Sequence, residues 1–119
     1  MPEKIKLCGV PETMLQTVYA RAKESRTRGA IRDTKAEELI GNLDYDFSLA
    51  DKDLAMQSGV IARTIVLDRL TGKWIAENND ATVVNIACGL DTRCYRIRGY
   101  SRWYNLDLPE TITVREKLL

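Results

Sequence analysis

Apolar residues recur three or four positions apart over residues 11–76, which is the spacing of helices that bury one face. The first helix is predicted to open at Pro11, because proline suits the first position of a helix. Gly29 ends this helix or the loop that follows it. The apolar stripe of the first helix comprises Met14, Leu15, Val18, Tyr19 and Ala22.

Two further helices are expected in this part of the chain. A short one should begin near Asp33 and Thr34, since Thr34 and Glu37 have the spacing of a capping box. Residues 43–53, LDYDFSLADKD, are interpreted as a loop that leads into a long third helix, with Gly72 near its end. One side of that helix is marked by Leu54, Ile61, Ile65 and Trp74.

The pattern changes from Asn79 onward. Residues 81–88, ATVVNIAC, form a nearly continuous apolar run, which is typical of a strand buried on both faces of a parallel sheet. GLDTRCYRIRGYS follows as a turn with about one helical turn, and RWYNLDL is a second strand candidate that ends at Asp107. Pro109 then opens another helix.

This order of elements predicts an α/β fold, in which a helical N-terminal cap precedes the first strands of a doubly wound sheet. Residues 1–78 would form the cap, and residues 79–119 the start of a Rossmann-like cofactor-binding domain that is incomplete in this chain. Two strands leave sheet edges and an apolar face open. We therefore expect either a piece of a longer protein or a chain that self-associates.

Small residues and an acid gather where the two predicted strands end. In open parallel sheets, ligands bind outside the carboxyl ends of the strands, where Ala87, Cys88 and Gly89 lie. Asp107 ends the next strand at the same edge, and a carboxylate there can accept hydrogen bonds from both hydroxyls of a ribose. Each signal alone also fits an ordinary turn or a helix cap. Together they predict a nucleoside-binding site.

Composition narrows the classes of function. The 119 residues carry a net charge of +1, which gives no electrostatic case for a nucleic-acid or membrane partner. No stretch approaches the roughly 20 apolar residues of a membrane span. Three cysteines without CxxC spacing, in a chain without histidine, argue against a metal site and favour reduced thiols in the cytoplasm.

NIACGLDTRCYRI, followed by WYNLDLPETITVREKLL, resembles the leucine carboxyl methyltransferase family, and within it the bacterial branch of polyketide O-methyltransferases of the tetracenomycin type. The combination of GLDTR and DLP is specific. ETMLQTVYARAKES and IARTIVLDRL extend the resemblance over nearly the whole chain. The resemblance implies a class I methyltransferase that uses S-adenosylmethionine, with a carboxylate or a small-molecule hydroxyl as methyl acceptor.

The resemblance also implies roles for single residues. Gly89 matches the second glycine of the family's cofactor turn, and Ala87 stands where the first glycine is usual, a replacement that suits a negative φ. Asp107 matches the acid that binds the ribose. Arg63 matches an arginine that pairs with the carboxylate of the cofactor's methionine part, as guanidinium geometry favours. Arg21 is a further candidate, although a solvated helix face explains it equally well.

The remaining residues of this segment are given structural roles, and no catalytic residue is assigned. Thr92 is placed to cap a short helix, Arg93 to pair with Asp91 or another acid, and Cys88 to pack as a small residue. A carboxylate acceptor needs no general base at neutral pH, whereas a hydroxyl acceptor does. The lack of histidine slightly favours the carboxylate, and we expect these 119 residues alone to be inactive, because they do not encode a full acceptor pocket.

Two other classes of function stay open at this point. An NAD-binding Rossmann domain has the same order of strand, turn and acid, but ACGLDT lacks the G-x-G-x-x-G spacing. A non-enzymatic module would instead use the helical part as an interaction surface.

Overall fold

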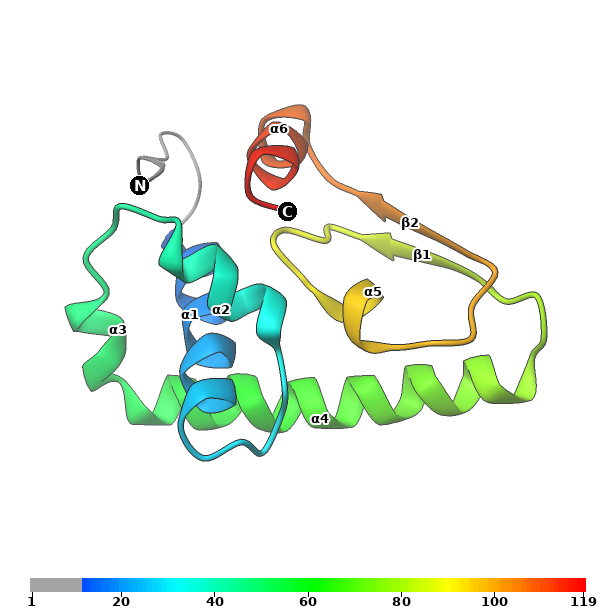
Figure 1. Cartoon of the computed structure of the whole chain (residues 1–119), viewed down its shortest axis with the longest axis horizontal. Coiled ribbons are helices and arrows are strands. Elements are labelled where there is room, and N and C mark those ends of the chain that lie inside the picture. The colour runs from blue at the N-terminus through cyan, green and yellow to red at the C-terminus, as the bar shows by residue number, and fades with distance from the viewer. Residues whose placement is uncertain (1–11) are drawn as a thin grey trace.

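The computed structural model describes residues 12–119, and the predicted helix start at Pro11 lies outside them, as does Cys8. Helix α4 runs along one side of the molecule, with α1, α2 and α3 over one half and the strands over the other (Figure 1). The elements in chain order are α1 (Glu12–Arg26), α2 (Thr34–Gly41), α3 (Ser48–Lys52), α4 (Leu54–Glu77), β1 (Thr82–Ile86), α5 (Arg93–Arg96), β2 (Arg102–Leu106) and α6 (Pro109–Leu118).

The two strands form a parallel sheet, so the α/β class is confirmed. Their register places Val83 beside Trp103 and Asn85 beside Asn105. The connection between them contains only the single turn of α5, as expected from the sequence. One face of the sheet packs on the end of α4 through a cluster that includes Ile75, Ala81, Val83, Ile97, Tyr100 and Trp103.

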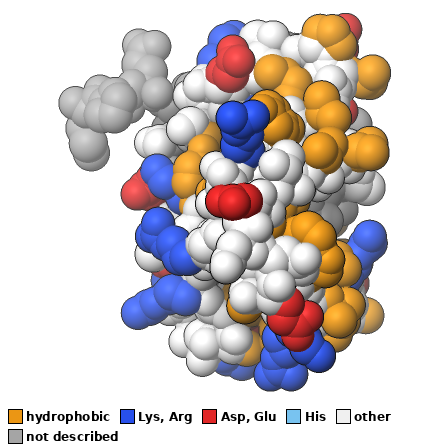
Figure 2. Space-filling model, turned by 90° about the vertical axis from the view of Figure 1, so that its right-hand side faces the viewer, with side chains coloured by type: hydrophobic (Ala, Val, Ile, Leu, Met, Phe, Trp, Pro, Cys, Tyr) orange, Lys and Arg blue, Asp and Glu red, His pale blue; other side chains and the backbone are white. Residues whose placement is uncertain are grey.

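The prediction that β1 is buried on both faces is wrong for this chain. Successive side chains of a strand point to opposite faces, and the described helices cover only one of them. On the other face, Val84 is 52% exposed and Ile86 is 77% exposed, with Tyr104 and Leu106 beside them about half exposed. Figure 2 shows apolar side chains gathered along one side of this end of the molecule, with several charged side chains along the opposite side.

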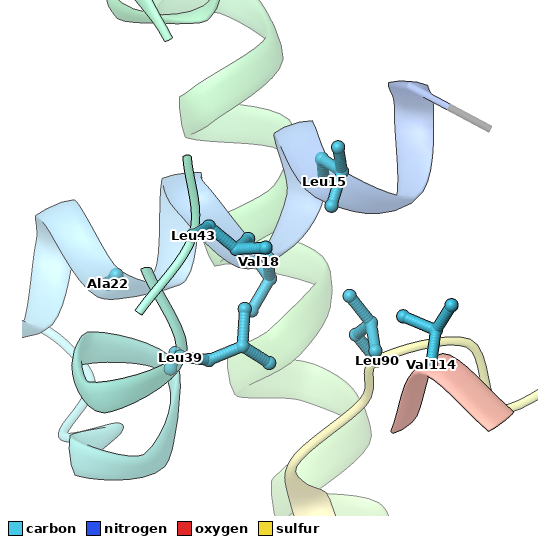
Figure 3. Packing of buried hydrophobic residues seen from close by; sticks show 8 residues of the cluster. Leu15, Val18, Ala22, Leu39, Leu43, Leu90 and Val114 are labelled. Atoms are coloured by element: carbon cyan, nitrogen blue, oxygen red, sulfur yellow. The ribbon is translucent and has the colours of Figure 1, made fainter. Parts of the chain in front are cut away.

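The main core joins the helical part to the segments that follow the strands. It consists of Leu15, Val18, Ala22, Ala36, Leu39, Leu43, Leu90 and Val114. Leu90 follows β1 and Val114 belongs to α6, and the two side chains lie near each other at one end of the cluster (Figure 3). The predicted stripe of α1 is thus confirmed at Leu15, Val18 and Ala22, and the stretch after β1 is anchored in the core through Leu90.

The start of α2 was predicted in the right place but with the wrong cap. Asp33 is the N-cap residue, and its Oδ1 accepts a hydrogen bond of 3.0 Å from the backbone N–H of Ala36. Thr34 is exposed, and Glu37 accepts a hydrogen bond from Ser25 instead of closing a capping box. Aspartate caps a helix at least as well as threonine, and here it occupies the buried position.

The stretch before α4 differs from the prediction, whereas the end of α4 agrees with it. The stretch 43–53 is not all loop, because it contains the short helix α3, which packs through buried Ala50. Helix α4 ends at Glu77, shortly after Gly72 as predicted, and Ile75 in its last turns packs under the sheet. None of the helices within residues 12–119 has the length and apolar character needed to cross a bilayer.

Candidate functional site

A cavity of about 710 Å³ opens at the carboxyl ends of the two strands. Residues 87–91 line it and belong to the stretch that follows β1, which we call the strand-end turn (residues 87–92). Helices α1, α4 and α6 contribute the walls. The five residues that the sequence singled out all line this cavity: Arg21, Arg63, Ala87, Gly89 and Asp107.

The ends of the two strands are joined through Asp107. The backbone N–H of Gly89 donates a hydrogen bond of 2.8 Å to Asp107 Oδ2, and the N–H of Leu108 donates one of 2.7 Å to Oδ1. Each carboxylate oxygen has two lone pairs, so the carboxylate retains the capacity to accept hydrogen bonds from hydroxyl groups in the cavity. The predicted pairing of turn and acid is therefore present in the fold.

The strand-end turn contains two residues with positive φ. Gly89 has φ +51°, and a Cβ added there would lie 3.3 Å from Met14 Sδ, so both the backbone conformation and the space favour glycine. Ala87 has φ +57°, which corrects the expectation of a negative angle at this alanine. A left-handed conformation costs a residue with a Cβ about 1–2 kcal/mol. The turn is strained at Ala87.

Arg63 extends from α4 at the cavity. Its side chain is exposed, and no acid within residues 12–119 forms an ion pair with it. Arg63 is therefore both exposed to solvent and part of the cavity wall. An unpaired guanidinium at this position is available to an anionic group.

Arg21 is buried, so the alternative of a solvated helix face is wrong for it. The residue is only 6% exposed. Its Nε donates to Asp33 Oδ2 at 3.0 Å and its Nη2 donates to the carbonyl oxygen of Leu90 at 2.9 Å. Burial lowers the pKa of Arg21, and the negative charge of Asp33 opposes that effect. Two of the donors of Arg21 thus serve the protein itself.

Asp33 is a residue of this region that the sequence reasoning missed as part of the site. Its carboxylate is fully buried, and Oδ2 accepts from Arg21 Nε, from Thr92 Oγ1 at 2.6 Å and from Arg96 Nη1 at 3.0 Å. An acid in front of a helix is a routine capping signal, so nothing in its local sequence distinguishes it. Only its partners, which are far from it in sequence, show that it belongs to this region.

Thr92 does not cap α5 with its side chain, which corrects that prediction. The hydroxyl is drawn instead to the buried carboxylate of Asp33. The prediction for Arg93 is confirmed, because it pairs with Asp68 at 2.7 Å and with Asp91 at 3.3 Å. Arg96 pairs with both Asp33 and Asp68.

These ion pairs form one network, buried at Arg21 and Asp33 and partly buried elsewhere, that we call the aspartate–arginine network. Its members are Asp33, Asp68, Asp91, Arg21, Arg93 and Arg96. The three acids balance the three arginines, so the network carries no formal net charge. A balanced, hydrogen-bonded set is the form in which buried charges are tolerated in proteins.

Arg115 of α6 is a second residue that the sequence reasoning missed. Its Nη1 donates to the carbonyl oxygen of Asp91 at 2.6 Å and to that of Gly89 at 3.3 Å. Because these are backbone contacts, no residue pairing in the sequence could have indicated them. Cys88, in contrast, was predicted correctly as a small packing residue, and its burial raises the pKa of its thiol.

Comparison with known proteins identifies the chain. The model of the leucine carboxyl methyltransferase family matches residues 14–119. The chain belongs to this family. The resemblance carried by GLDTR and DLP is thereby confirmed. In this member of the leucine carboxyl methyltransferase family, the two motifs are joined by the hydrogen bond from the N–H of Gly89 to Asp107.

Two curated relatives match almost all of the chain. It is 40% identical to the tetracenomycin polyketide synthesis O-methyltransferase TcmP of Streptomyces glaucescens, over 99% of this chain and 45% of that protein. It is 29% identical to the S-adenosyl-L-methionine-dependent methyltransferase dpfgK of Gibberella zeae, over 98% of this chain and 43% of that protein. The chain thus spans less than half the length of the curated relatives it matches.

Proposed function

We propose that the protein containing this chain is an S-adenosylmethionine-dependent O-methyltransferase and that the cavity at the strand ends binds the cofactor. The observation that carries this proposal is the bond between Gly89 N–H and Asp107, inside a cavity that also holds Arg63. Family membership and the two named methyltransferases support it. The two parallel strands with their helical cap would be the first part of a Rossmann-like, class I domain.

Each predicted residue has a role that suits the chemistry of this cofactor. Asp107 would accept hydrogen bonds from the ribose hydroxyls, and the positive-φ turn at Ala87 and Gly89 would let the ligand lie against the backbone. Arg63 would pair with the carboxylate of the methionine part. When bound, the cofactor supplies an electrophilic methyl group on a sulfonium, and the protein positions the reactants around it.

The methyl acceptor is proposed to be a small molecule that offers a carboxylate or a hydroxyl oxygen. A carboxylate is ionised at neutral pH and attacks without a general base, whereas a hydroxyl must lose a proton. This chain has no histidine to take that proton, and we assign no catalytic residue within it. We propose that the 119 residues alone lack methyltransferase activity, and a cytoplasmic location remains a prediction.

Calorimetric titration of the full-length protein tests the cofactor. We expect S-adenosylmethionine and S-adenosylhomocysteine to bind and NAD not to bind, which separates the proposal from a dinucleotide-binding domain. Asp107→Ala should weaken binding by roughly 1.5–3 kcal/mol for each hydrogen bond that the charged carboxylate makes to the ribose.

The control is Glu77→Ala, which removes an exposed carboxylate from the end of α4, outside the cavity lining. It should leave affinity unchanged. Unchanged affinity in a folded Asp107→Ala protein contradicts the assignment of Asp107. A wild-type protein that binds neither form of the cofactor would leave the non-enzymatic interaction module as the better reading.

A further inference from the structure

We infer that Asp33 is a positioning residue for the cofactor site, an inference that rests on the proposed function. Asp33 is not among the residues that line the cavity. It would act through Arg21 and Thr92, which connect its buried carboxylate to the strand-end turn. Its task would be to hold that turn in the geometry that the cofactor requires.

The carboxylate of Asp33 is the point at which three helices and the strand-end turn meet. Oδ1 caps α2 through Ala36, while Oδ2 receives Arg21 from α1, Thr92 from the strand-end turn and Arg96 from α5. Arg96 Nη1 also donates to Thr92 Oγ1 at 2.5 Å, which closes a ring of contacts around the hydroxyl. The carboxylate is fully buried, so water cannot substitute for these contacts.

Arg21 connects the carboxylate of Asp33 to the backbone of the strand-end turn. Its guanidinium is planar, so the bond from Nε to Asp33 sets the direction in which Nη2 reaches Leu90 O. Arg115 binds the carbonyl oxygens of Gly89 and Asp91. Three successive carbonyl groups of the turn are thus held by two arginines that come from α1 and α6.

The strand-end turn needs such support, because two of its residues have positive φ and one of them is an alanine. Strained backbone persists only where its surroundings determine it. The same turn carries the N–H of Gly89 that bonds to Asp107. A change in the direction of Arg21 would therefore alter the position of Gly89 relative to the acid proposed to bind the ribose.

Asp33→Asn is the decisive variant. Asparagine keeps the size of the side chain and the oxygen that caps α2, but it removes the charge that orients Arg21 and Arg96. In the full-length protein, we expect S-adenosylhomocysteine to bind roughly ten- to a hundredfold more weakly, since the loss of one hydrogen bond to a charged group has an effect of this size. The matched control is Asp53→Asn, the same change at the exposed N-cap of α4, which should bind as the wild type does.

Two further measurements distinguish positioning from a general loss of stability. Titrations are made well below the thermal midpoint of each variant, and amide hydrogen exchange is followed by mass spectrometry. Positioning predicts faster exchange in residues 87–92 of Asp33→Asn, while the far end of α4 around Ile75 keeps its wild-type rate. If Asp33→Asn does not fold, the pair Thr92→Val and Thr92→Ser takes its place: serine keeps the hydroxyl and should retain the affinity that valine loses.

The outcomes separate the two proposals. Unchanged exchange of the turn, or unchanged affinity in folded Asp33→Asn, overturns the inference, as does equal loss in Thr92→Val and Thr92→Ser. The remaining case is faster exchange confined to the strand-end turn of Asp33→Asn, together with a wild-type protein that binds no cofactor. This result would show that Asp33 positions the turn, and it would contradict the proposed function.

Discussion

At the scale of single residues, the strand-end turn shows how two small residues differ in what they contribute. Gly89 occupies a conformation that glycine adopts freely, and an added Cβ would be in close contact with the side chain of Met14. Ala87 adopts nearly the same φ with a methyl group attached. The neighbouring contacts to Asp107, Arg21 and Arg115 hold a conformation that alanine by itself disfavours.

Ala87→Gly is accordingly expected to be neutral or to stabilise the protein by up to about 1.5 kcal/mol. Removing the methyl group relieves about 1–2 kcal/mol of strain in the folded state. Glycine also gives the unfolded chain more conformational freedom, which lowers stability by roughly 0.5–1 kcal/mol. The comparison is Ala62→Gly at an exposed position within α4, which should destabilise by about 1 kcal/mol. Denaturant unfolding measures both, and equal destabilisation in the two variants would show that Ala87 is not strained.

At the scale of elements, the contact between α1 and α2 supports the site indirectly. Leu39 of α2 is completely buried in the cluster that also contains Leu90 of the strand-end turn. The apolar spacing of the helices predicted which faces turn inward. It did not predict that a residue of the turn would share their core, because that contact joins segments far apart in sequence.

Leu39→Ala should lower the free energy of unfolding by roughly 2–5 kcal/mol, because it leaves a cavity between closely packed elements. Leu49→Ala is the matched control, since Leu49 is 80% exposed on α3 and its truncation should change stability by less than about 0.5 kcal/mol. Thermal or denaturant unfolding provides the measurement. A similar small effect for both leucines would mean that the core does not depend on α2.

At the scale of the whole molecule, the sheet has one covered face and one open face. Within residues 12–119, the open apolar face is formed by Val84 and Ile86 of β1 and Tyr104 and Leu106 of β2. Contiguous exposed apolar surface and unpaired strand edges both favour association.

We predict that residues 1–119, expressed by themselves, form dimers or larger assemblies. Val84→Lys should lower the apparent mass, because a charge on the open face is costly to bury in an interface. Leu49→Lys, which places the same charge on the exposed α3, should not. Light scattering after size-exclusion chromatography measures the mass directly, and a compact wild-type monomer over a wide concentration range would rule the prediction out.

Several features of the site followed from local pattern. The small residues after β1 and Asp107 after β2 could be placed at one edge because the carboxyl ends of parallel strands meet there. Arg63 and Arg21 entered through the family resemblance, and both line the cavity. The positive φ of Ala87 was missed, because alanine gives no signal of that conformation.

The sequence by itself determined both strands, the helical segments other than α3, the family and the edge of the sheet at which the candidate site lies, because periodicity, turn residues and motifs are local properties. Only the tertiary structure decided that Asp33 meets Arg21, Thr92 and Arg96, and that Arg115 binds the carbonyl groups of the turn. Those partners come from different elements, and several are backbone atoms that every residue type shares. Their meeting depends on how the helices pack over the strands, which no local pattern encodes.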